Sequence, residues 1–171
     1  MFWESVLIGI LSGFIASIVF FAVMLIIKPR ANVSSQICKR ISKDSNKSVY
    51  QIKIVNLTRA TLSNLRYCLQ YNIDNGDGTS NVTEIKPSKS CLFYIDKYRR
   101  RDKDAKYAVR ISFNIDESEH ELKDRAYYIF TLYAQHGLSN TATCKREIYK
   151  SGSIIEGIFE TGKSIKILRN K

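Results

Sequence analysis

The distribution of hydrophobic residues divides the chain into two parts of different kinds. From Ser5 to Ile27 it carries 23 residues in a row without a charge, most of them Ile, Phe, Val and Leu. As a helix this run is about 35 Å long, enough to cross a hydrocarbon core roughly 30 Å thick. We therefore predict a transmembrane helix and assign residues 1–28 as the membrane anchor.

A cleaved signal peptide is the alternative interpretation of this run. It would need a basic start, an apolar stretch of about 7–15 residues and a cleavage site of small residues. The chain instead begins Met-Phe-Trp-Glu, its apolar run is longer, and Lys28, Pro29 and Arg30 follow it. These features favour a retained anchor.

Beyond residue 48, apolar and polar residues alternate with a period of two, as expected of strands with one face on a core and one in water. Three segments show this alternation, at 50–54, 65–73 and 107–115. This alternation places Lys53 on the water side of the segment 50–54. The segment 127–133 is apolar or β-branched on both sides, which predicts a central or doubly covered strand.

Other short runs complete a β-rich domain. The further strand candidates are about 33–41, 80–86, 90–96, 140–149 and 163–168. Eight or so short strands without a long amphipathic helix predict an all-β antiparallel sandwich of the immunoglobulin-like type. We place a basic juxtamembrane segment with the first strand at 29–47, the β-sandwich domain at 48–171, and one short helical turn at 116–124.

The distribution of charge gives the membrane helix a direction. On its N-terminal side stands the α-amine, opposed by Glu4, whereas basic residues dominate the other flank. These basic residues are Lys28, Arg30, Lys39, Arg40, Lys43 and Lys47, with Asp44 as the acid among them. Because Lys and Arg favour the cytoplasmic side, we predict a bacterial inner-membrane protein with its N-terminus outside and its C-terminal domain in the cytoplasm.

The part of the chain after the span is basic: it holds all 27 Lys and Arg residues and all 16 acids except Glu4, so its net charge is +12. Such a module at an inner leaflet attracts anionic membrane lipids. The candidate binding residues for lipid or an acidic partner are Lys28, Arg30, Lys97, Arg99, Arg100, Arg101 and Lys103. Most belong to the segment 97–106, for which a solvated loop is the alternative. We do not expect a nucleic-acid partner, because the chain has neither a helix-turn-helix pattern nor an RNA-stacking signature.

Small residues recur every four positions in the predicted helix, at Ser5, Gly9, Gly13 and Ser17. This spacing lines one helix face and lets two backbones approach closely, so it predicts a homo-oligomer formed through the membrane helix. The same spacing also occurs in membrane helices that do not pair.

Part of the strand pattern resembles a known family. Tyr50–Asn56, then Asn64 and Leu65, then Tyr149 followed by Ile154–Phe159, are similar to the strands of the cytoplasmic domains of inward-rectifier potassium channels. The resemblance implies an immunoglobulin-like sandwich and no functional residue, because the chain has neither a second membrane helix nor a TVGYG-like filter. The chain also resembles bacterial single-pass membrane proteins built from one N-terminal helix and a small β-sandwich.

No motif in the sequence predicts a reaction. The four cysteines form no CxxC pair, and the glycine-rich run 74–78 lacks the oxygen ligands of a calcium loop and is typical of a hairpin turn. A Ser139–His136 pairing lacks a nucleophile elbow. The P-loop spacing at 157–164 is followed by an expected strand rather than a helix. We therefore expect no enzyme activity, no cofactor and no metal site.

These observations lead to two functional hypotheses. The first is a membrane-anchored β-sandwich that acts in protein–protein interaction or assembly at the inner membrane face, next to membrane lipids and an unknown protein partner. The second is a membrane-anchored sensor or effector, of a defence or toxin type, that binds an acidic small ligand. Asn-x-Ser/Thr patterns such as Asn56-Leu57-Thr58 match glycosylation acceptors and carry no weight for a cytoplasmic domain.

Overall fold

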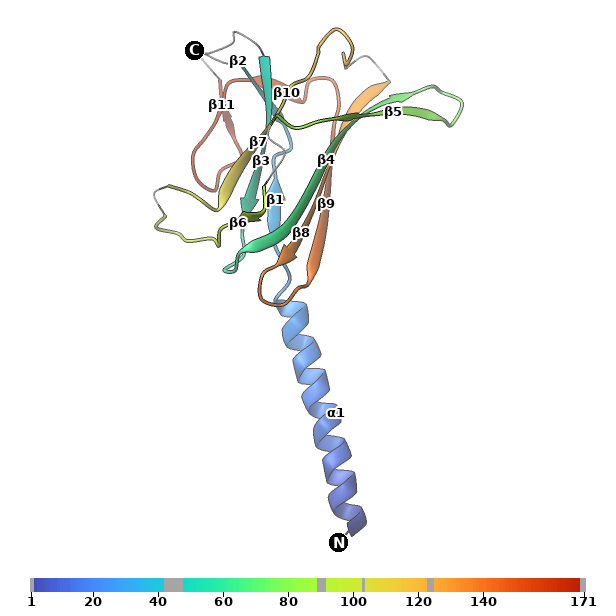
Figure 1. Cartoon of the computed structure of the whole chain (residues 1–171), viewed down its shortest axis with the longest axis vertical. Coiled ribbons are helices and arrows are strands. Elements are labelled where there is room, and N and C mark those ends of the chain that lie inside the picture. The colour runs from blue at the N-terminus through green and yellow to red at the C-terminus, as the bar shows by residue number, and fades with distance from the viewer. Residues whose placement is uncertain (1, 42–47, 89–91, 103, 123–124, 170–171) are drawn as a thin grey trace.

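The chain folds into one N-terminal helix and one β domain (Figure 1). The computed structural model describes residues 2–41, 48–88, 92–102, 104–122 and 125–169. The helix, α1 (Phe2–Ile26), extends away from one end of the domain, and every side chain from Phe2 to Val23 is exposed. Its stretch Phe2–Met24 is long and apolar enough to cross a membrane. The predicted helix is thus confirmed in position and length.

The first sheet is organised around β3. Its strands are β1 (Ala31–Val33), β2 (Ile37–Ile41), β3 (Ser48–Asn56), β7 (Ala108–Phe113) and β10 (Ile154–Glu156). β3 pairs antiparallel with β1 and β2 along one edge and with β7 along the other. β10 pairs with β2 in parallel, which departs from the expected antiparallel arrangement. The predicted strand 33–41 is two strands, and both belong to the sheet of β3, so this sheet begins at Ala31.

The second sheet is antiparallel and follows the order β5-β4-β8-β9, with β6 also paired to β4. Its strands are β4 (Leu62–Asp74), β5 (Ser80–Ile85), β6 (Tyr94–Ile95), β8 (Ala126–His136) and β9 (Ala142–Tyr149). β8 is a central strand, as the apolar run 127–133 predicted. A short hairpin, β11 (Ile158–Phe159) with β12 (Ile167–Leu168), completes the domain. The strand candidates did not include β10 and β11, whereas the resemblance to the channel domains covered Ile154–Phe159.

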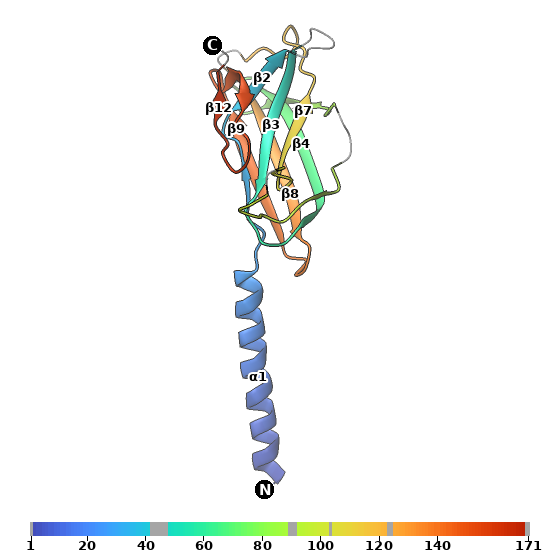
Figure 2. The same cartoon turned by 90° about the vertical axis from the view of Figure 1, so that its left-hand side faces the viewer.

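The two main sheets share one hydrophobic core. Ile52 and Phe113 from the first sheet belong to the same buried cluster as Leu69 and Phe130 from the second. The rings of Phe113 and Phe130 meet edge to face, with centroids 6.3 Å apart. In Figure 2 the first sheet lies in front of the second. The predicted alternation is confirmed at most positions; Ile73, near the end of β4, is exposed instead of buried.

The acidic segment after β7 lies at the end of the domain away from α1 (Figure 1). It forms one turn, closed by a hydrogen bond of 3.0 Å from the His120 amide to the Asp116 carbonyl. Buried tyrosines hold this turn from below: Tyr128 donates to the His120 carbonyl at 2.5 Å, and Tyr71 donates to the Glu121 carbonyl at 2.8 Å. The described part of the predicted turn 116–124 is therefore present.

Lys53 is the main exception to the predicted alternation, because its side chain is buried with 1% of its surface exposed. The segment between β11 and β12 covers it. Its ammonium donates to the carbonyls of Glu160 at 2.5 Å and Ser164 at 2.6 Å. Burial, and secondarily the charge of Arg110, lowers the pKa of Lys53 to about 8. The outer face of β3 is thus covered by protein at Lys53 rather than exposed to water.

Gly157 allows the C-terminal segment to return over the sheet. A side chain at this position would place a Cβ 2.2 Å from the Leu168 carbonyl oxygen, and the backbone φ is +156°. The Gly157 carbonyl also accepts a hydrogen bond of 3.0 Å from the buried Cys38 thiol. Burial raises the pKa of Cys38. Of the four cysteines, Cys38, Cys68 and Cys144 are free thiols, and Cys91 lies outside the described residues.

We expect the stability of the domain to depend on pH through Lys53. The pKa of Lys53 is about 8 in the folded chain, below the roughly 10.4 of an unfolded lysine, so protonation disfavours the folded state. Between about pH 8 and pH 10 the unfolded state still holds this proton and the folded state has released it, so stability from this group rises with pH. Urea unfolding should show wild type gaining stability relative to Lys53→Met across this window. A difference between the two proteins that is constant with pH would contradict the assignment.

Candidate membrane-proximal binding surface

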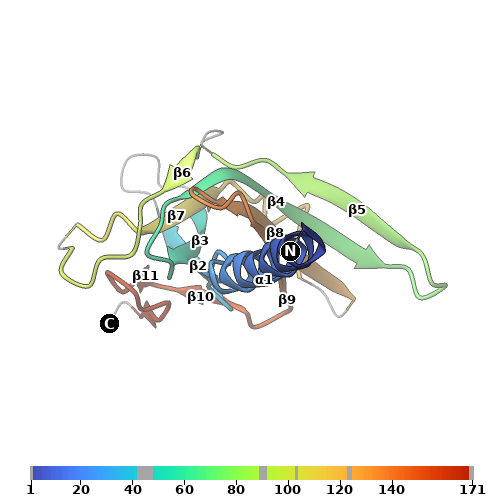
Figure 3. The same ribbon diagram turned by 90° about the horizontal axis from the view of Figure 1, so that it is seen from below.

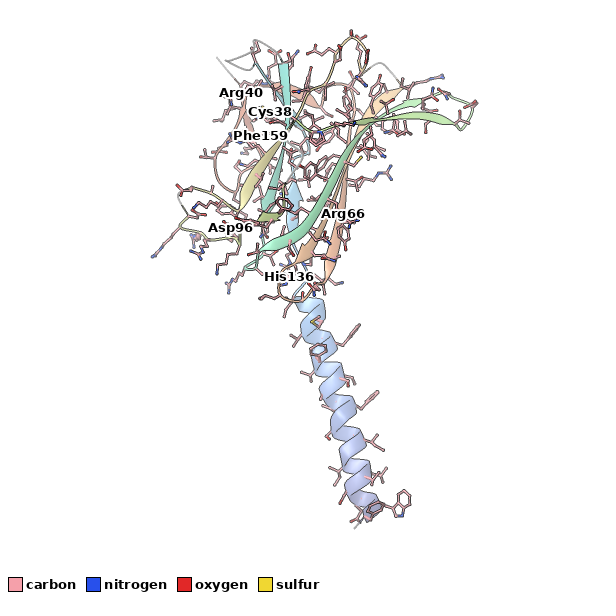
Figure 4. All side chains as sticks on the ribbon, in the orientation of Figure 1. Cys38, Arg40, Arg66, Asp96, His136 and Phe159 are labelled. Carbon is pink, nitrogen blue, oxygen red and sulfur yellow. The ribbon has the colours of Figure 1, made fainter. Side chains whose placement is uncertain are left out.

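The helix exit is hydrogen-bonded to the turn between β8 and β9. The carbonyl of Ile27 accepts hydrogen bonds from the hydroxyls of Ser139 at 3.3 Å and Thr141 at 3.1 Å. Carbonyls in the last turn of a helix have no partner within the helix, so these hydroxyls act as a C-terminal cap supplied from more than 100 residues away. Figure 4 labels His136, the last residue of β8, at this end of the domain. The junction therefore joins the helix directly to the second sheet.

The loop between β3 and β4 provides a second attachment. Its Thr58 hydroxyl accepts a hydrogen bond of 3.0 Å from the Arg30 amide, and the Arg30 carbonyl accepts one of 2.7 Å from the Leu57 amide. Pro29, between the helix and these contacts, is buried. Only residues 27–30 separate α1 from β1. Seen along the helix from below, α1 approaches the domain beneath its strands rather than outside it (Figure 3).

Asn56 organises this loop from the interior. It is fully buried, and its amide donates to the carbonyls of Ala60 at 2.8 Å and Asp96 at 2.9 Å. Its side-chain oxygen accepts a hydrogen bond of 2.8 Å from the Thr58 amide. All of these bonds are made by one side chain, so the loop 57–61 and the start of the basic segment share a single support. In this folded structure the Asn56 side chain is inaccessible to glycosylation.

The two predicted basic groups meet at this loop. The Tyr98 amide donates to the Thr58 carbonyl at 2.8 Å, so the segment that begins at Lys97 and the segment that contains Arg30 contact the same residue. We call the surface around the loop 57–61, which lies next to the end of the candidate membrane helix, the membrane-proximal surface. Its basic members among the predicted residues are Lys28, Arg30, Lys97, Arg99 and Arg101. Figure 4 shows Asp96, which precedes Lys97, on one side of the domain and His136 nearer the helix.

The surface contains two hollows of different character. A side hollow of about 480 Å³ is lined by Lys97, Arg99, Arg101 and Lys106 together with Thr61, Asp96 and Asp102. A hollow of about 500 Å³ at the helix exit contains Lys28, Arg30 and Arg59, and its lining includes no carboxylate. The carboxylates of Asp96 and Asp102 thus offset part of the positive charge of the side hollow, whereas the helix-exit hollow has no carboxylate to offset its charge.

Sequence reasoning identified some of these residues and missed others. Arg100 is exposed on the turn of the 97–106 segment and lines neither hollow, and Lys103 lies outside the described residues. Arg59 and Lys106 were missed as site residues. Lys106 belongs to the basic run that the sequence displays, whereas Arg59 is a single basic residue whose position beside the helix exit depends on the fold.

The small-residue stripe lies on the open surface of α1. Ser5, Gly9, Gly13 and Ser17 are all exposed, and an added Cβ at Gly9 or Gly13 would meet no atom within 4 Å. The Ser17 hydroxyl donates to the Gly13 carbonyl at 2.8 Å, a bond within the helix that turns the hydroxyl away from solvent or lipid. The stripe is available for helix packing, and pairing through it stays a prediction.

Ser139 and His136 lie side by side, and their contacts close the β8–β9 turn and cap the helix exit. The Ser139 hydroxyl lies 3.1 Å from Nδ1 of His136, and the same nitrogen accepts the Ser139 amide at 3.2 Å. Because a backbone amide can only donate, Nδ1 serves as an acceptor for its own turn. The hydroxyl also reaches the Ile27 carbonyl. This geometry stabilises the turn and the helix exit.

The glycine-rich run 74–78 has a structural role. The 74–78 run forms the turn of the β4–β5 hairpin, in which Asp74 and Asp77 accept backbone amides of Gly76 and Thr79. Within the described ranges, no group of three His, Cys, Asp or Glu side chains is placed to hold a metal ion.

Neither the protein-family models nor the curated proteins that were compared with the chain give a match. The helix, its bonded exit and the membrane-proximal surface are therefore the features of the chain that bear on its function.

Proposed function

We propose that the chain is a single-pass inner-membrane protein that holds an immunoglobulin-like β-sandwich against the cytoplasmic membrane face, where it acts in protein–protein interaction or assembly. The observation that carries the proposal is the bonded helix exit, with Ile27 attached to the β8–β9 turn and Arg30 to the β3–β4 loop. A long flexible tether would leave the domain free to rotate. A short bonded junction instead presents the same face of the domain to the membrane.

Two features support the sandwich part of the proposal. The main sheets are almost wholly antiparallel, and side chains from both enter one core, as in two-layer β folds. The distal acidic turn, exposed from Asp116 to Glu119, remains available to a protein partner. The basic membrane-proximal surface, including Lys97, Arg99 and Arg101, would draw the lower side of the domain toward anionic lipids.

Membrane topology provides the direct test. The full chain, with a C-terminal tag and expressed in bacteria, should stay in the membrane pellet after alkaline carbonate extraction. External protease applied to spheroplasts should leave the tag intact, because the positive flank retains the domain inside. Release by carbonate would contradict the anchor, and digestion of the tag in intact spheroplasts would contradict the orientation.

Removal of the capping hydroxyls should loosen the domain on its helix. In Ser139→Ala/Thr141→Val, the Ile27 carbonyl loses both side-chain donors, at a cost in stability of about 1–2 kcal/mol. We expect faster rotation of the domain in lipid nanodiscs, measured as a shorter rotational correlation time from a fluorophore on the domain. Thr143→Val, on β9 of the same hairpin, is the matched control. Equal correlation times in both proteins would contradict a fixed junction.

The side hollow favours a second candidate function, the membrane-anchored sensor or effector for an acidic small ligand. Four basic residues converge there from one segment, as they would around phosphate or carboxylate groups. The full chain in micelles, crosslinked with and without ATP as an acidic probe, should then form more oligomer with ATP. Arg99→Gln/Arg101→Gln should abolish this gain, and Gly9→Ile/Gly13→Ile should do so by blocking helix pairing. Oligomer yields that are the same with and without ATP would favour the first function.

A further inference from the structure

The tip of the β8–β9 turn carries an apolar side chain that the fold leaves uncovered. Leu138 has 86% of its surface exposed, the largest fraction among the large apolar side chains of the described residues, those of α1 included. A leucine at a polar turn has no packing reason to be there. It lines the helix-exit hollow together with Ile27 and Lys28. The most exposed leucine of the domain is therefore next to the end of the membrane helix.

The turn is held in this place by several bonds. The Gly137 amide donates to the Thr61 carbonyl at 2.9 Å, the Asn140 amide donates to the His136 carbonyl at 3.0 Å, and the His136 amide donates to the Thr141 carbonyl at 2.8 Å. Ser139 and Thr141 then bind Ile27 itself. Because the turn is bonded to Ile27 through Ser139 and Thr141 and to the β3–β4 loop through Gly137, the depth of Leu138 in a membrane follows from the depth of Ile27. The uncharged run ends at Ile27, directly after α1, so this depth is the boundary between acyl chains and headgroups.

The charges around Leu138 match one kind of surface. Lys28, Arg30 and Arg59 are exposed in the same hollow, with no carboxylate in its lining. An apolar tip surrounded by cations can bury its side chain among acyl chains while the cations bind lipid phosphates. A protein partner would have to reach between the domain and the bilayer from which α1 emerges. The position and the charge therefore favour lipid.

We infer that the β8–β9 turn is a second membrane contact, in which Leu138 enters the interface of an anionic leaflet and Lys28, Arg30 and Arg59 bind its phosphates. The inference rests on the proposed function, because it requires α1 to span the membrane. It adds a second point of attachment beside the helix. Together these two points fix the tilt of the domain as well as its distance from the bilayer.

Tryptophan fluorescence measures this contact in the full chain. Trp3, the sole tryptophan, is replaced by Phe, and Leu138→Trp provides the probe. The protein is reconstituted in vesicles of phosphatidylcholine with one quarter phosphatidylglycerol, with bromine on the upper acyl chain as the quencher. We expect the Leu138→Trp protein to be quenched at least threefold more than the control Ile148→Trp, in which the indole replaces an exposed apolar side chain toward the far end of β9. Adding Lys28→Gln/Arg30→Gln/Arg59→Gln to the Leu138→Trp protein should lower its quenching in these vesicles toward the level in pure phosphatidylcholine.

The outcomes separate the inference from the function on which it rests. Vesicles that retain the chain after carbonate extraction, with the Leu138→Trp probe quenched no more than the Ile148→Trp control, would overturn the second contact and leave the anchor in place. Extraction of the chain by carbonate would overturn the anchor. Strong quenching that is the same in anionic and pure phosphatidylcholine vesicles would overturn the role of the three cations.

Discussion

Replacing Phe130 with alanine should lower the free energy of unfolding of the β domain by about 3–5 kcal/mol. Phe130 lies on the central strand β8 and is fully buried. Its ring meets that of Phe113 from the opposite sheet. The truncation would remove a ring contact between β8 and the first sheet and leave a cavity that rigid β strands cannot close. Urea unfolding of the full chain in micelles, followed by near-ultraviolet circular dichroism, measures the loss.

Ile148→Ala is the matched control for this experiment. Ile148 lies on the neighbouring strand β9 with 52% of its surface exposed, so its truncation should cost less than about 1 kcal/mol. A double-mutant cycle with Phe113→Ala should give a coupling of about 0.5–1.5 kcal/mol, the usual value for an edge-to-face pair. Equal losses for Phe130→Ala and Ile148→Ala would mean that the sheets do not share a core, and the sandwich proposal would lose its main support.

The N-terminal apolar helix and most strands follow from the sequence because each depends on a local pattern. The uncharged run ending at Ile27 needs only its length, and the alternation around Ile111 or Tyr50 needs only the period of a strand. Alternation decides which side chains share a face of a sheet. It does not decide whether a second layer covers the other face, and Lys53 shows the difference. Its cover comes from Glu160 and Ser164, more than 100 residues later in the chain.

The division of the first strand candidate has a similar cause. Ser34, between β1 and β2, is fully buried, and its carbonyl accepts a hydrogen bond of 2.7 Å from the hydroxyl of Tyr149. Its amide donates to the Lys53 carbonyl at 2.9 Å. A serine directly after the apolar Val33 looks like the polar side of a continuous strand. The hydrogen bond that Tyr149 donates to the Ser34 carbonyl cannot be recognised from the residues around Ser34.

The basic residues were recognisable from sequence as two separate groups, one beside the helix and one around Arg99. Their meeting at Thr58 was not, because it depends on how β3 ends and on the return of the chain before Tyr98. Asn56 gave only a glycosylation pattern, although its burial makes it the support of the surface. Long-range hydrogen bonds, rather than composition, therefore determine the candidate site.

Replacing Asn56 with alanine should have the largest effect on the membrane-proximal surface. The change leaves the carbonyls of Ala60 and Asp96 and the amide of Thr58 without their partner. Buried groups that lose a hydrogen bond cost about 1–3 kcal/mol each, and water reaches some of them, so we expect a total loss of about 2–4 kcal/mol. The loop 57–61 should also become mobile while the sheets persist. Hydrogen exchange should then accelerate at the Tyr98 amide, which bonds to Thr58.

Asn72→Ala separates this role from the general cost of removing a buried asparagine. Asn72 is also buried, but the bond its amide makes to the Gln70 carbonyl is long, at 3.3 Å, and lies within β4 away from the helix exit. Its replacement should cost about 1 kcal/mol and leave Tyr98 protected. If Asn56→Ala likewise leaves the exchange at Tyr98 unchanged, the two basic groups do not depend on Asn56. If exchange accelerates in Asn56→Ala alone, one interior side chain fixes the surface beside the helix exit.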